Sequence, residues 1–115
     1  MEHSDRMQIL ATDLQQRASD ASALMKAMSN ENRLMILCNL LHGEKTVGEL
    51  EHGIGLSQSA LSQHLAVLRE NHLVSTRRDA QSIFYSLAGG EARAVIETLY
   101  DLYSTADGGC CGTGS

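Results

Sequence analysis

The sequence predicts a mainly α-helical fold with one small β-hairpin, and three observations lead to this fold class. Apolar residues recur at helical spacing in five separate stretches, and two β-prone runs flank a polar turn in the second half of the chain. The length of 115 residues suits one domain with one core. Because only 3% of the residues are aromatic, that core is aliphatic, and folds that stack single-stranded nucleic acid on aromatic side chains are excluded.

A heptad stripe of small and apolar residues runs from Met7 to Met28 at alternating spacings of four and three. It predicts a long helix of roughly 30 Å, which is longer than so small a domain needs for its own core. We therefore expect this helix to pack against a second copy of the chain. The alternative is a helix that lies wholly on its own domain or breaks near residues 19–20.

Capping residues mark the next two helices. Ser29 and Asn30 precede an apolar stretch that ends near Leu41, before the stop signal His42-Gly43. Thr46 opens a sequence of the capping-box form, which predicts a short helix over about residues 47–52, ended by glycines 53 and 55.

Ser57 is placed to cap a fourth helix, whose buried stripe is Leu61, Leu65 and Leu68. Two short helices joined by a Gly-Ile-Gly-Leu-Ser turn, with Leu50, Ile54 and Leu56 inside, are typical of a helix-turn-helix. The side of the fourth helix opposite the stripe is uncharged and short, and its residues are Ser59, Ser62, Gln63 and Ala66.

The hairpin is predicted from residues 73–78 and 82–87, which flank Asp79-Ala80-Gln81. After Gly89-Gly90 a final helix carries the apolar residues Ala92, Val95, Ile96, Leu99, Leu102 and Tyr103. The order of helices and hairpin is that of a winged helix-turn-helix. We expect residues 1–106 to form the DNA-binding and dimerisation domain and residues 107–115 to form a flexible tail rich in glycine and cysteine.

The charge is uneven along the chain. The net charge is −5, yet residues 57–87 carry three Lys or Arg against two Asp or Glu and are the only positive segment. Arg77 and Arg78, followed by Gln81, place cations near the hairpin tip, where they can meet DNA phosphates or the minor groove. The N-terminus lacks a basic region followed by an apolar run, so we expect a soluble, cytoplasmic protein.

The outer face of the fourth helix has the chemistry needed to read base edges. The Gln63 amide can bridge N6 and N7 of adenine, serine hydroxyls donate or accept, and Ala66 can touch a thymine methyl group. A merely solvated face is the alternative, but such faces usually carry Lys and Glu, whereas charge is absent here until Arg69.

Three segments together resemble the ArsR/SmtB family of bacterial repressors: residues 27–34 (AMSNENRL), 56–65 (LSQSALSQHL) and 81–85 (QSIFY). The resemblance spans about residues 7–105. It implies a homodimer that binds a double-stranded operator, is released by an inducer, and is not an enzyme. His64 is expected to pack or to contact phosphate. The predicted DNA contacts are Ser57, Gln58, Ser59, Ser62, Gln63, His64, Arg77, Arg78 and Gln81.

Two metal sites known in that family are absent from this sequence. Residues 47–52 hold no thiol where some members carry a Cys-x-Cys box, and residues 91–104 hold no histidine where zinc sensors place ligands. We therefore expect no metal at either place and no cofactor.

Cys38, on the apolar face of its helix, resembles the first cysteine of the subgroup that senses reactive sulfur or oxidants through a dithiol. Where that subgroup has its second cysteine this chain has Ser104, and the other thiols are Cys110 and Cys111. Six helical residues span about 9 Å, which is the distance from Ser104 to Cys110 if the helix continued. Residues 105–109 can reach roughly 17 Å when extended, so the tail can fold back to the level of Ser104 and bring Cys110 or Cys111 toward Cys38. A buried, inert Cys38 is the alternative.

Other functions remain open from the sequence. Arsenite prefers thiolates, and Cys110 and Cys111, with Cys38 as a third ligand, can bind it. A dimerisation module that does not bind DNA is a second alternative, which a sequence-specific gel shift would separate. A cysteine hydrolase needs a histidine and a carboxylate beside one thiol, and the sequence contains no such constellation.

Overall fold

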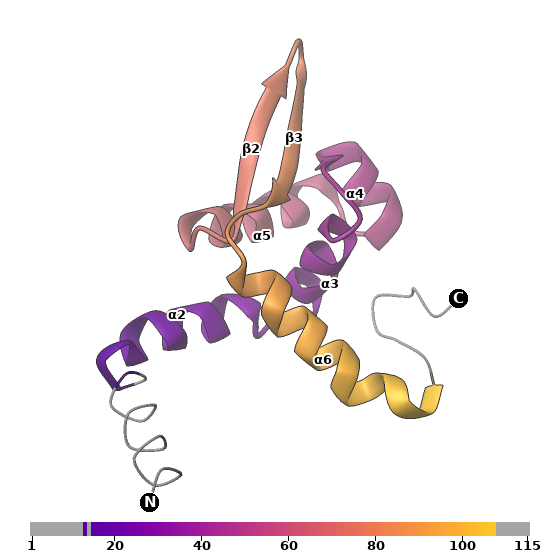
Figure 1. Ribbon diagram of the computed structural model, residues 1–115. Coiled ribbons are helices and arrows are strands. Elements are labelled where there is room, and N and C mark those ends of the chain that lie inside the picture. The colour runs from indigo at the N-terminus through magenta and orange to yellow at the C-terminus, as the bar shows by residue number, and fades with distance from the viewer. Residues whose placement is uncertain (1–12, 14, 108–115) are drawn as a thin grey trace, which may run out of the picture.

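The computed structural model describes residues 13 and 15–107, and it confirms a winged helix-turn-helix (Figure 1). The β2–β3 hairpin projects away from α2 and α6, with the helix-turn-helix of α4 and α5 at its base. Within the described residues, no helix is long and apolar enough to cross a membrane. The elements are α2 (Ala18–Met28), α3 (Glu31–Leu40), β1 (Lys45–Thr46), α4 (Val47–Ile54), α5 (Gln58–Glu70), β2 (Val74–Asp79), β3 (Ser82–Leu87) and α6 (Glu91–Asp107).

Side-chain caps begin three of the helices where the sequence predicts them. The Asn30 side chain accepts hydrogen bonds from the backbone N–H groups of Asn32 (2.9 Å) and Arg33 (3.1 Å). Thr46 completes a capping box at the start of α4, and the Ser57 hydroxyl accepts from the Ala60 N–H at 3.2 Å. These caps satisfy N–H groups that have no partner inside the helix.

α4 is longer than the sequence predicts. It continues through Gly53 to Ile54, because the residue that leaves the helix is Gly55, with φ of 90°. Glycine adopts this left-handed conformation without steric cost, so Gly55 rather than Gly53 sets the angle between α4 and α5.

The core joins α3, α4, α5 and α6 through aliphatic side chains. The predicted stripe of α5 is fully buried, and Leu50 from α4 packs with it. Burial of a leucine side chain contributes about 1.5–3 kcal/mol, so this core fixes the orientation of α5 and of its opposite face. The largest fully buried side chains are Ile36, Leu37, Leu40, Leu50, Leu61, Leu65, Leu68 and Ile96.

The sheet has one strand that the sequence analysis missed. β1 pairs antiparallel with β3 (Lys45 opposite Tyr85), so the strand order is β1-β3-β2. The hairpin register places Arg77 opposite Phe84 and Asp79 opposite Ser82. The predicted three-residue turn is therefore wrong, because Asp79 belongs to β2 and only two residues connect the strands.

The helix predicted from Met7 to Met28 is interrupted within its described part. Arg17, with φ −107° and ψ 16°, lies in a turn before α2. The break lies two residues before the place considered in the alternative, and residues 7–12 lie outside the described residues. The side chains of residues 13 and 15–20 are exposed, and backbone hydrogen bonds from the Arg17 N–H to the Asp13 carbonyl (3.1 Å) and from the Ala21 N–H to the Arg17 carbonyl (2.9 Å) cross the turn. The predicted tail also lies outside the described residues, apart from Asp107, which ends α6.

Candidate nucleic-acid interface and thiol site

The side of α5 that is predicted to read DNA is exposed and lies opposite the buried stripe of the helix. Packing of Leu61, Leu65 and Leu68 into the core turns the opposite side of α5 to the solvent. The predicted base-reading residues on that side are all exposed, as are Ser57 and Gln58 at the start of the helix: Ser59, Ser62, Gln63 and Ala66. The Ser57 hydroxyl also caps α5, so its role in the fold is local.

His64 is half-buried and has a neighbour that the sequence analysis missed. The Arg33 Nη1 atom lies 3.5 Å from His64 Nδ1. A guanidinium can only donate a hydrogen bond, so Arg33 is the donor side of this contact.

Arg33 also reaches back to α2. Its Nε atom donates to the Ala27 carbonyl, and its Nη2 atom donates to the Lys26 carbonyl at 3.3 Å. One side chain on α3 therefore touches both the end of α2 and the middle of α5. The partners lie 6, 7 and 31 residues away in the chain, and no local pattern marks them.

The hairpin cations differ in how they are held. Arg77 Nη2 lies 2.6 Å from Glu44 Oε1, and Nε donates to Oε2 at 3.2 Å, which is a bidentate pair. The guanidinium also lies 4.7 Å from the Phe84 ring centroid. The hydrogen bond to Arg77 lowers the pKa of Glu44, and the same bond raises the pKa of Arg77.

Arg77 therefore lies along the hairpin and contacts the loop before β1, rather than standing as a separate cation at the tip. Arg78 and Gln81 lie nearer the tip and are exposed. No local pattern predicts the Arg77–Glu44 pair, because 33 residues separate its members.

The two predicted kinds of DNA contact lead to a first testable result. A Gln63→Ala variant is expected to lose discrimination between an operator and random DNA by roughly 1–3 kcal/mol, because a bidentate base contact is removed. Arg78→Ala is the comparison of choice, since Arg77 is paired with Glu44. It is expected to weaken both duplexes alike and to lower the salt dependence. Gel shifts at several salt concentrations measure both effects, and equal losses on the two DNAs for Gln63→Ala would contradict the base contact.

Cys38 lies at the wall of a pocket between α3 and α6. Its side chain is 4% exposed, and the pocket encloses about 280 Å³. Cys38 is disulfide-bonded, and Cys110 and Cys111 lie outside the described residues. The described part of the chain holds no group of three or more His, Cys, Asp or Glu that could bind a metal ion. The pocket is lined by Glu31, Leu34, Met35, Cys38, Ile96, Leu99 and Tyr103.

Comparisons with known proteins agree with this architecture. Residues 30–76 match the model of the bacterial regulatory protein, arsR family. The transcriptional activator HlyU of Vibrio cholerae is 52% identical over 95 residues, which are 83% of this chain and 88% of HlyU. The structure of reduced HlyU from that organism, 53% identical, has a TM-score of 0.74 and covers 79% of this chain and 96% of its own.

Two further solved structures are similar. The transcriptional repressor BigR from Xylella fastidiosa is 43% identical, with a TM-score of 0.77, over 81% of this chain and 95% of BigR. A homodimeric winged helix-turn-helix DNA-binding domain from Mycobacterium bovis is 30% identical, with a TM-score of 0.66, over 73% of this chain and 81% of that one. These relatives regulate transcription and are not enzymes. With its helix-turn-helix, its wing and these identities, the chain belongs to the arsR family of bacterial regulatory proteins and is a DNA-binding transcriptional regulator.

Proposed function

We propose that the protein is a homodimeric repressor that releases operator DNA when reactive sulfur species or an oxidant link Cys38 to Cys110 or Cys111. The observation that carries this proposal is the position of Cys38 at a pocket whose opposite wall is α6. A covalent link there acts on α3, which packs against α5, and on α6, which carries exposed apolar residues.

The chemistry requires two thiols and a two-electron oxidant. Each thiol loses one proton and one electron as the sulfur–sulfur bond forms, and peroxide is reduced to water or a polysulfide to hydrosulfide. A direct disulfide needs Cα atoms within about 7 Å of each other, while inserted sulfur atoms relax that limit. Glycines flank Cys110 and Cys111 in the sequence, and glycine allows the backbone conformations that a direct disulfide or a polysulfide bridge to Cys38 requires.

The link releases DNA through the spacing of the two half-sites. A dimer of this kind places two recognition helices in successive major grooves about one helical turn apart. A change in the angle between α3 and α6 alters that spacing without any clash at the DNA. Two relatives support the proposal: BigR is a transcriptional repressor, which favours repression, and HlyU has been solved in a reduced form, which favours a thiol switch.

A titration of one operator duplex with protein in four states tests the proposal. The protein is fully reduced, or reduced and then treated with polysulfide, peroxide or arsenite. Coupling of 1–3 kcal/mol predicts that polysulfide or peroxide weakens operator binding by about 5- to 150-fold, and that dithiothreitol restores it. Peptide mass spectra are expected to show Cys38 joined to Cys110 or Cys111.

Other outcomes distinguish the alternatives. Release by arsenite alone would assign the switch to a soft-metal site at Cys110 and Cys111 and would overturn the sulfur-sensing proposal. Equal binding in all four states would leave a DNA-binding regulator without a thiol switch, and the proposal would then be wrong.

A further inference from the structure

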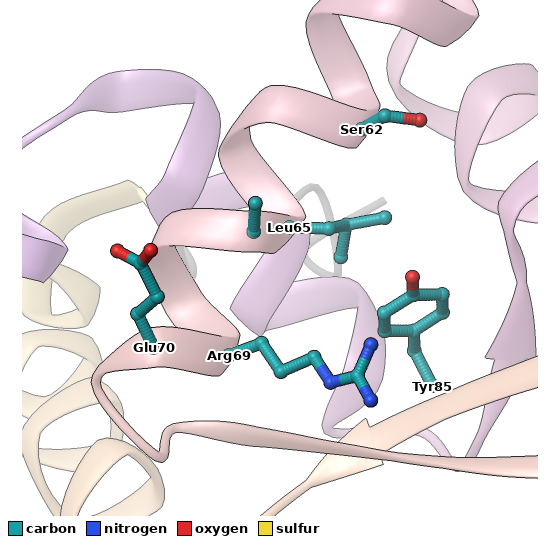
Figure 2. Close-up of a pocket in the computed structure, with 6 residues that line it drawn as sticks. Ser62, Leu65, Arg69, Glu70 and Tyr85 are labelled. Carbon is teal, nitrogen blue, oxygen red and sulfur yellow. The ribbon is translucent and has the colours of Figure 1, made fainter.

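A recess between α5 and the β2–β3 hairpin, which is the wing, is lined by Arg69 and Tyr85, two residues that the predicted DNA contacts do not include. It encloses about 320 Å³ between α5 and β3. In Figure 2, the Arg69 side chain extends toward the Tyr85 ring, and the hydroxyl groups of Ser62 and Tyr85 lie on the same side of α5. The lining residues are Ser62, Leu65, Ala66, Arg69, Glu70 and Tyr85.

The recess is lined by one cation, Arg69, and one carboxylate, Glu70. Among the described residues, the salt bridges join Arg77 to Glu44 and Asp79, and none involves Arg69. The neighbouring carboxylate of Glu70 points away from the Tyr85 side of the helix (Figure 2). An exposed guanidinium has five N–H donors and no acceptor, so Arg69 offers an anion in this recess a charged donor.

The recess is continuous with the base-reading face. Ser62, Ala66 and Arg69 follow one another at spacings of four and three, so they lie along one side of α5. The first two also belong to the face predicted to enter the major groove. Arg69 is therefore exposed on the same side of α5 as residues that are predicted to enter the major groove.

Tyr85 is held more rigidly than an ordinary surface residue. It lies in the central strand of the sheet, opposite Lys45 on one side and Thr76 on the other. Its ring is half-buried. Pairing on both sides therefore holds the backbone from which the Tyr85 side chain reaches the recess.

We propose that this recess binds one phosphate group of the DNA backbone, with Arg69 as the charged donor and the Tyr85 hydroxyl as a neutral donor. The inference rests on the DNA-binding part of the proposed function and not on the thiol switch. Phosphate chemistry is shared by inorganic phosphate, so the experiment includes both sources.

The test uses fully reduced protein, so that failure of the thiol switch cannot affect the result. Arg69→Gln is compared with the wild-type protein and with Arg93→Gln, which removes another exposed arginine, on α6. Binding is measured on a duplex selected for tight binding and on a random duplex, at several salt concentrations. Circular dichroism and sedimentation check that each variant is folded and has the wild-type oligomeric state.

The expected result is a loss of roughly tenfold in affinity for both duplexes with Arg69→Gln, as for a lost charged hydrogen bond. The slope of log affinity against log salt is expected to fall by about 0.9 for each protomer bound. Tyr85→Phe is expected to lose roughly two- to tenfold, with an unchanged slope. Arg93→Gln is expected to bind as the wild-type protein does.

A duplex series with single neutral methylphosphonates locates the phosphate. The wild-type protein is expected to lose affinity at one position in each half-site, and Arg69→Gln is expected to lose nothing further there. The proposal is overturned if Arg69→Gln and Tyr85→Phe both retain wild-type affinity and salt slope. It is also overturned if Arg69→Gln weakens only the selected duplex, which indicates a base contact, or if inorganic phosphate binds through Arg69 while DNA affinity is unchanged.

Discussion

A Cys38→Ser protein is expected to remain on operator DNA under polysulfide and peroxide treatments that release the wild-type protein. A serine hydroxyl cannot form a sulfur–sulfur bond, so the proposed link to the chain end is lost completely. Serine is close to cysteine in size, and a cysteine site that is 4% exposed can accept it without steric change. The measurement is the gel shift of reduced and treated protein on the same duplex, with intact mass recorded for each sample.

Variants of the other cysteines complete this experiment. Cys110→Ser and Cys111→Ser separately show which sulfur joins Cys38, and the double variant is expected to behave as Cys38→Ser does. If polysulfide still releases Cys38→Ser, the proposed switch is wrong. If only arsenite releases it, the inducer is a soft metal bound by the remaining pair.

A Leu102→Asp protein is expected to sediment as a monomer at micromolar concentration and to lose operator affinity by about 10²-fold or more, because two linked half-site contacts become two separate ones. The reason is the exposure of large apolar side chains on α6. Leu102 and Tyr103 are 63% and 68% exposed in the single chain, and Met25 on α2 is 69% exposed. Exposed apolar side chains that lie together, as Leu102 and Tyr103 do, mark surfaces at which proteins associate.

Arg93→Asp is the matched control for the dimer experiment. It also places a carboxylate on the surface of α6, nine residues from Leu102 and therefore on the opposite side of the helix. This variant is expected to stay dimeric and to bind as the wild-type protein does. A wild-type protein that sediments as a monomer would contradict the dimer itself, and a dimeric Leu102→Asp would place the interface elsewhere.

Local signals predicted most of the fold. Asn30, Thr46 and Ser57 cap their helices as expected, because a cap involves residues only two or three positions apart. The stripe of α5 and its outer face follow from helical period alone. Leu102 and Tyr103 continue the predicted stripe of α6 but are exposed, because the core of this protomer ends before them.

These local signals could not predict contacts between segments that are distant in the sequence. β1 has two residues and no periodicity, and it exists because β3 offers a free edge beside it. The pairing of Arg77 with Glu44 likewise depends on the hairpin passing the loop before β1. The recess beside Tyr85 needs α5 and β3 together, so no motif within either segment indicates it.

Lysine cannot take over the structural role of Arg33. Its guanidinium meets two carbonyl oxygens of α2 and the His64 ring of α5 at the same time. A lysine in its place offers a single point of charge and not a planar fork, so it cannot reproduce this three-way geometry. A substitution that keeps the charge is therefore still expected to uncouple α2 from α5.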